Sequence, residues 1–178
     1  MKFRHNIAFV LTCLLIFVPI ADAEEDKEYR LGSGDRVNVI VYGHKDLSGE
    51  FEVDSAGRLS LPLIQVVRAE GLTEQELEEA ITRKLKPDYL LNPRVSVDIL
   101  TYRPFYILGE VKNPGSYPYS SGMTVVNAVA LGGGFTYRAD KDDVIIIRAS
   151  DPERKKIPAK HDTKVFPGDI IEVTERFF

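Results

Sequence analysis

The sequence has few of the residues that most often carry protein chemistry. Its one cysteine, Cys13, lies in an apolar N-terminal run, so the rest of the chain has no disulfide, thiolate metal site or cysteine nucleophile. After residue 23 the remaining histidines are His44 and His161, and their separation argues against a zinc site. No apolar run after residue 23 is long enough to cross a membrane as a helix.

Patterns that would indicate an enzyme are also missing. Asp140, Asp142 and Asp143 form an acidic turn without the glutamate that completes a calcium loop. The glycines at 132–134 follow a predicted helix, whereas a phosphate-binding loop has glycines before one. A formal net charge of −4 with scattered Lys and Arg gives no basic stripe for nucleic acid. The sequence therefore predicts no catalytic site, no metal, no cofactor and no nucleic-acid partner.

The N-terminus has the features of a secretory signal peptide. Basic residues at the start are followed by an apolar run over 7–20 and by Ala21-Asp22-Ala23, which predicts cleavage between Ala23 and Glu24. A retained anchor is the alternative. A lipoprotein signal at Cys13 is disfavoured, because Val10-Leu11-Thr12 precedes this residue and the apolar run continues past it. We expect an exported, periplasmic protein associated with the outer membrane.

The clearest helix begins after Thr73. Glu76, three residues on, completes a capping box with this threonine. Apolar residues recur at spacings of three and four up to Leu85, and Pro87 ends the helix. The glutamates between residues 74 and 79 complement the helix dipole, and we interpret this charged side as a solvated face.

Strands surround this helix on both sides. An alternating run over 37–42 is followed by strand signals at 50–53 and 58–62, and the turn at 54–57 between them predicts a hairpin. A further alternating strand over 94–99 closes a first domain.

A second domain begins near residue 103 with a strand over 105–108. Thr124 begins a short helix that the glycines at 132–134 end, and 144–147 and 169–173 are the expected last two strands. The fold class expected for the whole chain is α+β.

The dipeptide Gly-Asp occurs in a similar context at Gly34-Asp35 and at Gly168-Asp169. Each pair comes immediately before an alternating strand, and the two lie at opposite ends of the chain that follows the signal peptide. We interpret them as one turn-to-strand solution used twice, since an isolated match does not establish a sequence repeat.

Five aromatic residues cluster around the start of the second domain. They are Tyr102, Phe105, Tyr106, Tyr117 and Tyr119. Aromatic rings stack on sugars and occur at protein interfaces. Packing of alternate members in the core is nevertheless the favoured interpretation, and the residues that contact a ligand are unknown from the sequence.

Several short motifs occur together in the order of one known family. In the first domain they are YRLGSGD (29–35), GEFEVD (49–54), GRLSLPL (57–63), GLT (71–73) and NPRVSV (92–97). In the second they are LGEVKNPGSY (108–117), TVV (124–126), GGF (133–135) and VFPGD (165–169). The chain resembles the outer-membrane polysaccharide export proteins, which carry capsule or exopolysaccharide out of Gram-negative bacteria.

The resemblance implies a polysaccharide export domain over 24–102 and a soluble-ligand-binding β-grasp (SLBB) domain over 103–178. Gln65 stands where the family usually has glycine, and Gly132 replaces a usual alanine. Longer members resemble lipoproteins with a C-terminal membrane helix, which is not found before Phe178. The expectation is therefore a short form that relies on a separate outer-membrane channel.

The predicted function is that of a subunit in a ring-like conduit for polysaccharide, with no bond chemistry. The implied partners are polysaccharide, further copies of the chain, an inner-membrane polysaccharide co-polymerase and the outer-membrane channel component. Strand edges left open by both domains are suitable surfaces for self-association. The alternative is a monomeric periplasmic carbohydrate-binding module.

Overall fold

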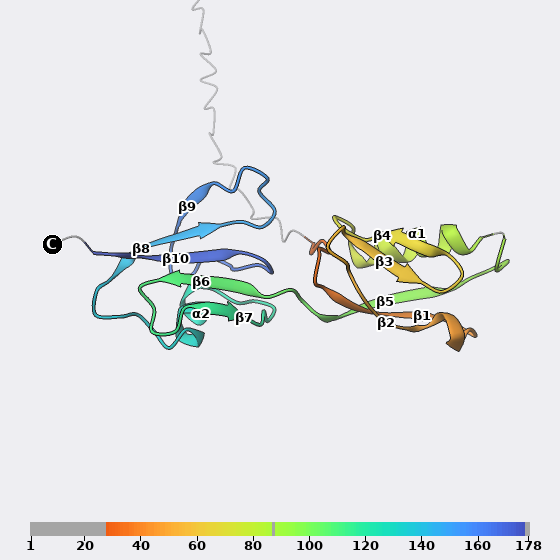
Figure 1. The fold of residues 1–178 in the computed structure, drawn as a ribbon, viewed down its shortest axis with the longest axis horizontal. Helices are drawn as coiled ribbons and strands as arrows, with labels where there is room; N and C mark the ends of the chain where they lie inside the picture. The colour runs from red at the N-terminus through yellow and green to blue at the C-terminus, as the bar shows by residue number, and fades with distance from the viewer. Residues whose placement is uncertain (1–27, 87, 177–178) are drawn as a thin grey trace, which may run out of the picture.

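The structure, a computed structural model, describes residues 28–86 and 88–176. These residues form two α-helices, one short 3₁₀ helix and ten strands, which confirms the α+β fold class. Figure 1 shows two units placed end to end and joined by one segment between β5 and β6. The predicted signal peptide and its Ala23–Glu24 cleavage position lie outside the described residues.

The N-terminal unit, residues 28–101, is built on a small antiparallel sheet with strand order β2-β1-β5. A separate two-stranded hairpin, β3-β4, and one helix complete the unit. The elements are β1 (Arg36–Val41), η1 (Lys45–Leu47), β2 (Gly49–Glu52), β3 (Arg58–Leu61), β4 (Gln65–Arg68), α1 (Glu74–Leu85) and β5 (Val95–Thr101).

The hairpin predicted across residues 54–57 is wrong. β2 pairs with β1, where Val37 faces Phe51, and β3 pairs with β4, where Leu59 faces Val67. The turn at 54–57 exists, since Gly57 has φ +73 and Asp54 accepts the Arg58 N–H, but it carries the chain out of the sheet. Short apolar strands pair equally well with several partners, so local turn chemistry does not decide the pairing.

Helix α1 begins as predicted. The Thr73 hydroxyl accepts the Glu76 N–H at 3.2 Å, and the Glu76 carboxylate accepts the Thr73 N–H at 2.9 Å, which confirms the capping box. The interpretation of the other glutamates as a solvated face is right for Glu74 and Glu79, which are exposed, whereas Glu78 is half-buried. Glu78 accepts the Val97 N–H at 2.9 Å and Glu74 accepts the Ile99 N–H at 3.0 Å. They close the outer edge of β5 against pairing with another strand.

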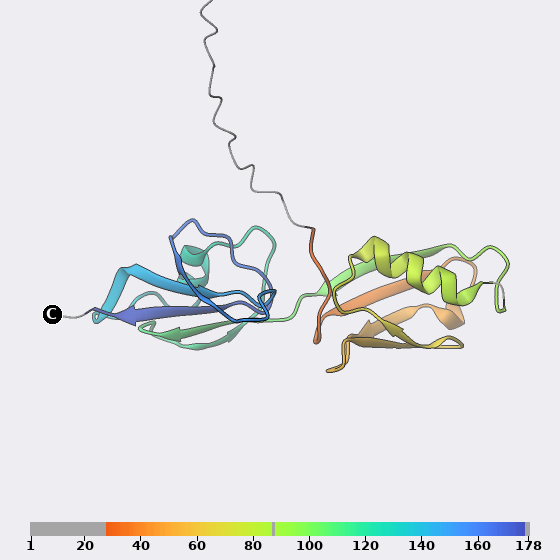
Figure 2. The ribbon, with the colours of Figure 1, turned by 90° about the horizontal axis from the view of Figure 1, so that it is seen from above.

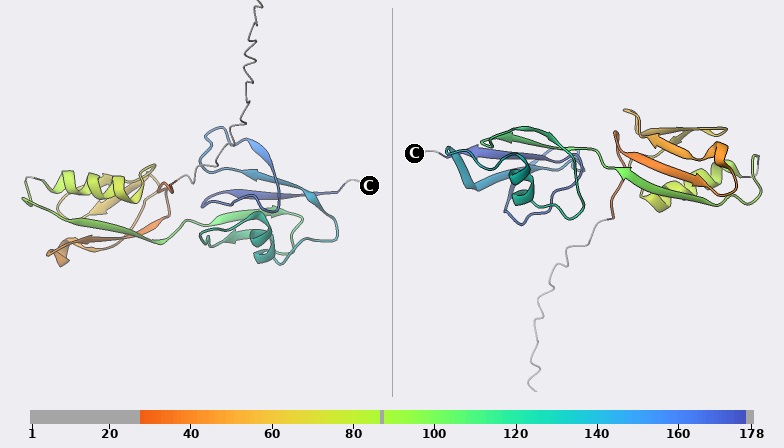
Figure 3. Two further views of the ribbon diagram at one scale, coloured as in Figure 1. Left: turned by 180° about the vertical axis from the view of Figure 1, so that it is seen from behind. Right: turned by 90° about the horizontal axis from the view of Figure 1, so that it is seen from below.

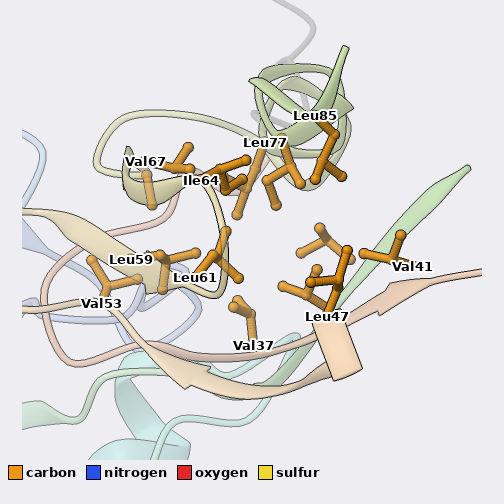
Figure 4. Packing of buried hydrophobic residues seen from close by; sticks show 14 of the residues in the cluster. Val37, Val41, Leu47, Val53, Leu59, Leu61, Ile64, Val67, Leu77 and Leu85 are labelled. Carbon is orange, nitrogen blue, oxygen red and sulfur yellow. The ribbon is translucent and has the colours of Figure 1, made fainter. Parts of the chain in front are cut away.

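The core of the N-terminal unit lies between α1, the hairpin and the sheet. In Figure 4, Leu77 and Leu85 point from α1 toward Leu61 of the hairpin and Val37 of β1. All four side chains are buried. The apolar residues at helical spacing in α1 and the alternate apolar residues of the strands therefore pack in one cluster.

The C-terminal unit, residues 105–176, is a five-stranded mixed sheet with order β7-β6-β10-β8-β9. Its central pair, β6 and β10, is parallel and the other pairs are antiparallel. Figure 2 shows α2 on one side of this sheet. The elements are β6 (Phe105–Gly109), β7 (Gly115–Tyr117), α2 (Val125–Leu131), β8 (Ala139–Ile147), β9 (Lys156–Ala159) and β10 (Ile170–Glu175).

Two predictions about this unit meet different outcomes. The helix after Thr124 is confirmed, and Gly133 and Gly134 end it with φ values of +81 and +87. The expectation that 144–147 and 169–173 are the last two strands is wrong, because β9 lies between them in the sequence. Ile157 of β9 points to the side of buried Ile146 but is 42% exposed, so the apolar signal of this edge strand is weak.

Figure 3 shows each helix lying alongside the sheet of its own unit. Among residues 28–86 and 88–176, no helix is long and apolar enough to span a membrane.

Candidate functional site

The two units meet at a turn that ends in a buried aspartate, Asp35. Its carboxylate accepts hydrogen bonds from the Tyr29 hydroxyl at 2.6 Å, the Gly32 N–H at 2.7 Å and the Arg103 N–H at 2.7 Å. The Arg103 guanidinium adds a 3.1 Å ion pair. Because Arg103 lies in the linker after β5, this side chain ties the linker to the N-terminal unit.

A second buried aspartate, Asp169, stands at the equivalent place in the C-terminal unit. It accepts the Phe166 N–H at 2.9 Å, the Ala149 N–H at 3.0 Å and a 2.8 Å hydrogen bond from Arg148. In both units the aspartate precedes a central strand and binds the residues that follow the antiparallel neighbour of that strand. The interpretation of one turn-to-strand solution used twice is confirmed.

The linker is held from both sides. Arg103 lies over the Tyr29 ring, 5.5 Å from its centroid. From the other unit, the Gly168 N–H donates to the Pro104 carbonyl at 3.0 Å. Gly168 also lies so near that a Cβ placed on it would come within 2.8 Å of the Arg103 Nε. These contacts fix how the linker leaves β5 and enters β6.

A cleft of about 400 Å³ opens beside this linker. Tyr29 and Tyr102 line it from the N-terminal side, and Tyr119, Lys164 and Phe166 line it from the C-terminal unit. The cleft thus exists only where the two units meet, and no single stretch of the sequence contains it.

Three tyrosines form the aromatic part of the cleft. The Tyr102 ring lies 4.9 Å from that of Tyr29 and 5.3 Å from that of Tyr119, in both cases edge to face, with interplanar angles of 86° and 81°. Burial raises the pKa of all three hydroxyls, and for Tyr29 the hydrogen bond to Asp35 raises the pKa further. The hydroxyls therefore remain protonated at neutral pH, able to donate and accept hydrogen bonds.

The predicted aromatic cluster is divided between the core and the surface. Phe105 is fully buried and Tyr117 packs against it, so the core interpretation is right for these two. Tyr106 lies on the exposed face of the sheet at 43% exposure. Tyr102 and Tyr119 reach the cleft. Tyr29, which the sequence analysis did not single out, joins them from a distant part of the chain.

The residues weighed as chemical groups in the sequence do not come together. His161 contacts the Lys141 carbonyl at 2.8 Å in the C-terminal unit, and His44 lies beside η1 in the other unit. Asp140 accepts the Asp142 N–H within β8, so the acidic turn predicted at Asp140, Asp142 and Asp143 is wrong, because these residues belong to a strand. Within the part of the chain that the structure describes, no group of acidic, histidine or cysteine side chains is arranged to hold a metal ion.

Comparison with known proteins gives matches to both halves of the chain. Residues 23–100 match the family model described as polysaccharide biosynthesis/export protein, and residues 104–158 match the SLBB domain. The two matches follow one another in the order that the sequence motifs predicted. The chain belongs to the polysaccharide export protein family.

Curated relatives agree with this assignment. The exopolysaccharide production protein ExoF of Rhizobium meliloti is 40% identical over 125 residues, which cover 64% of this chain and 30% of ExoF. The polysialic acid transport protein KpsD of Escherichia coli is 29% identical over 69% of this chain and 23% of KpsD. The EPS I polysaccharide export outer membrane protein EpsA of Ralstonia nicotianae is 27% identical over 83% of this chain and 48% of EpsA. The chain thus spans less than half the length of each of these relatives.

Proposed function

We propose that this protein is a subunit of a capsule or exopolysaccharide export complex and guides the polysaccharide toward the outer membrane without making or breaking bonds. The observation that carries the proposal is the match of both family models in sequence order over residues 23–100 and 104–158. The names of ExoF, KpsD and EpsA, which refer to production, transport and export, support it further.

The proposed assembly is a ring of identical subunits. The open surfaces of the C-terminal unit support self-association, since the sheet face opposite α2 has apolar side chains around one ion pair, Lys156–Glu172. The apolar residues are Tyr106, Leu108, Ile145, Ile147, Pro158 and Ile170. Strands β2, β7 and β9 are sheet edges as well, whereas the outer edge of β5 is closed by Glu74 and Glu78. Rings are the usual way in which identical subunits enclose a channel.

The proposed location is the periplasm, in association with the outer membrane, after export and cleavage between Ala23 and Glu24. An inner-membrane polysaccharide co-polymerase and an outer-membrane channel component are the proposed partners besides polysaccharide. The family assignment supports these partners, and the outer-membrane description of EpsA supports the location. Mass spectrometry of the exported protein should find Glu24 at its N-terminus, and a lipid-modified Cys13 terminus would contradict the proposed processing.

Light scattering on the purified protein tests the ring. We expect one assembly several times the mass of the chain, and we expect Leu108→Glu to shift it to monomer by placing a charge on the apolar sheet face. Val126→Glu is the matched control, because Val126 is 45% exposed against 49% for Leu108 and lies on α2, on the opposite side of the sheet. A protein that stays monomeric, even after crosslinking in cells, would contradict the ring.

Deletion of the gene tests the transport role. Surface polysaccharide should disappear while the synthesis enzymes remain active, and purified protein should leave oligosaccharides uncut. Normal surface polysaccharide in the deletion strain would overturn the export function.

The cleft between the units favours one second candidate function, a monomeric carbohydrate-binding module. Its three tyrosines are suited to sugar contact whether or not the subunits associate. A monomer in solution and in crosslinked cells, combined with saccharide binding, would support this candidate instead of the conduit.

A further inference from the structure

We infer that the cleft lined by Tyr29, Tyr102 and Tyr119 is a saccharide-binding site that holds a short segment of the exported polysaccharide at the junction of the two units. This inference rests on the proposed function, which makes polysaccharide the substrate. The cleft volume of about 400 Å³ lies within the range of small-ligand sites, roughly 300–1,000 Å³.

The chemistry of the cleft matches that of a sugar ring. A pyranose presents C–H groups on its faces and hydroxyls around its rim, so it is bound by aromatic surface with hydrogen-bonding groups close by. Tyr102 and Tyr119 each provide an aromatic ring and a hydroxyl, and Ser121 adds a hydroxyl at the exposed rim. Within residues 28–86 and 88–176, the Tyr102 hydroxyl makes no hydrogen bond to protein, so it is open to a ligand hydroxyl.

The cleft is fixed in shape before any ligand binds. The Tyr29 hydroxyl donates to Asp35 and accepts a 2.8 Å hydrogen bond from Arg103, which holds this ring in place. Tyr29 in turn supports Tyr102 through their edge-to-face contact. Tyr29 is therefore a positioning residue, while Tyr102 and Tyr119 are the contact residues. Preorganised side chains lose little conformational entropy on binding, which favours affinity for a flexible saccharide.

The charges around the cleft favour a saccharide over a phosphorylated ligand. One acidic residue, Glu28, and one basic residue, Lys164, line its exposed rim. Recognition of phosphate uses clustered Arg or Lys side chains or the N-terminus of a helix. The residues that line the cleft provide neither.

NMR titration of the processed protein with three probes tests the inference. The probes are maltohexaose, cellohexaose and a hyaluronan hexasaccharide, which differ in linkage and charge. We expect at least one of them to shift the amide signals of Tyr102, Tyr119 and Gly122. Tyr102→Ala should weaken that binding by about tenfold, and Tyr102→Phe, which keeps the ring and loses the hydroxyl, by about threefold.

Tyr137→Ala is the matched control, because Tyr137 is an exposed tyrosine in a turn, outside both the cleft and the sheet face proposed for self-association. It should leave the affinity unchanged. Tyr102 belongs to neither hydrophobic core, so Tyr102→Ala should keep the unfolding transitions of both units. The inference fails if no probe shifts the cleft signals, or if Tyr137→Ala weakens binding as much as Tyr102→Ala.

Complementation of the deletion strain separates this inference from the export function. If deletion abolishes surface polysaccharide and a chain with Tyr102→Ala and Tyr119→Ala restores it fully, the saccharide site is wrong and the export function stands. If deletion has no effect while the purified protein binds a probe at the cleft, the export function is wrong and the site stands. Weak complementation by the double variant, with full complementation by Tyr137→Ala, supports both.

Discussion

The two buried aspartates occupy the same local motif, but the arginines that they bind belong to different parts of the molecule. Asp35 and Asp169 each follow a glycine with positive φ, each precedes a central strand, and each pairs with an arginine whose side chain is 22% exposed. The partner of Asp169, Arg148, belongs to the same unit and lies over Phe166. The partner of Asp35, Arg103, belongs to the linker. One motif therefore stabilises a single unit in one case and fixes the junction of two units in the other.

Asp35→Ala and Asp169→Ala should produce the largest effects. Each change leaves a partly buried guanidinium and two backbone N–H groups without their acceptor, and each should lower the free energy of unfolding of its own unit by about 3 kcal/mol. Urea unfolding followed by NMR resolves the two units separately. Residual dipolar couplings should show a changed orientation between the units for Asp35→Ala and an unchanged one for Asp169→Ala.

Equal effects of both variants on the orientation would break this contrast. Asp35→Asn and Asp169→Asn, which keep the side-chain shape, provide the control for loss of packing.

The glycine before each aspartate gives a sharper contrast of intermediate size. Gly34 has φ +90 and open surroundings, where an added Cβ would lie 3.7 Å from the Arg103 Cβ, whereas Gly168 has φ +83 and would place a Cβ 2.8 Å from the Arg103 Nε. Gly34→Ala should cost about 1 kcal/mol from backbone strain alone. Gly168→Ala should cost about 2 kcal/mol, because Arg103 and Ala149, whose Cβ would lie 2.9 Å away, must also move.

Thermal unfolding of the two alanine variants measures this difference. Arg103→Ala should remove part of the extra cost at Gly168, since the Ala149 Cβ would still lie 2.9 Å from the added Cβ, and should leave the cost at Gly34 nearly as it was. An equal cost at both glycines in the wild-type background would contradict the crowding at Gly168.

A smaller effect should come from residues that adopt positive φ without being glycine. Gln65 has φ +58 in the N-terminal unit and Arg154 has φ +50 in the C-terminal unit. Gln65→Gly and Arg154→Gly should each stabilise their own unit by about 0.5 kcal/mol, since relief of strain exceeds the entropy lost by glycine. Urea unfolding followed by NMR in each unit measures this change. Stabilisation of the opposite unit would contradict the presence of a separate hydrophobic core in each unit.

The smallest effect should come from pH, and it should differ between the two helices. Hydrogen bonding to the Thr73 N–H, and then to Arg30, lowers the pKa of Glu76. A carboxylate with a lowered folded pKa stabilises the protein above its unfolded pKa of about 4.3 and loses this contribution as pH falls through the folded value. The cap of α2 uses the Asn127 amide, which does not titrate in this range.

Glu76→Gln tests this directly. Between about pH 6 and about pH 3, the urea midpoint of the N-terminal unit should fall less in the variant than in the wild type. The C-terminal unit should show the same pH profile in both proteins. Equal pH profiles of the N-terminal unit in the two proteins would show that Glu76 does not contribute to the acid sensitivity of this unit.

Local signals in the sequence predicted local structure well. The capping box at Thr73 and the glycines after Leu131 depend on neighbouring residues, and both are confirmed. The glycine that the family usually has at position 65 is explained by the positive φ of Gln65, a backbone value that the sequence alone does not reveal. The wrong hairpin at 54–57 arose because strand pairing depends on partners elsewhere in the chain.

The site required contacts over long sequence distances. The similarity of Gly34-Asp35 and Gly168-Asp169 was visible, but the partner of Asp35 lies 68 residues away and that of Asp169 lies 21 residues away. Tyr29 reaches Tyr102 only because Asp35 and Arg103 bring the two segments together. No periodicity or turn signal encodes such an encounter, so the cleft was not predicted.

The length of the linker between β5 and β6 is fixed by its contacts with both units. Consecutive residues, Arg103 and Pro104, are bound by opposite units, one through its N–H and the other through its carbonyl. Insertion of even a single residue here would shift one of these groups out of register, although loops usually tolerate insertions. The segment therefore sets a fixed spacing between the two units. Evolution and protein engineers should find length changes easier in the β8–β9 loop than at this short crossing.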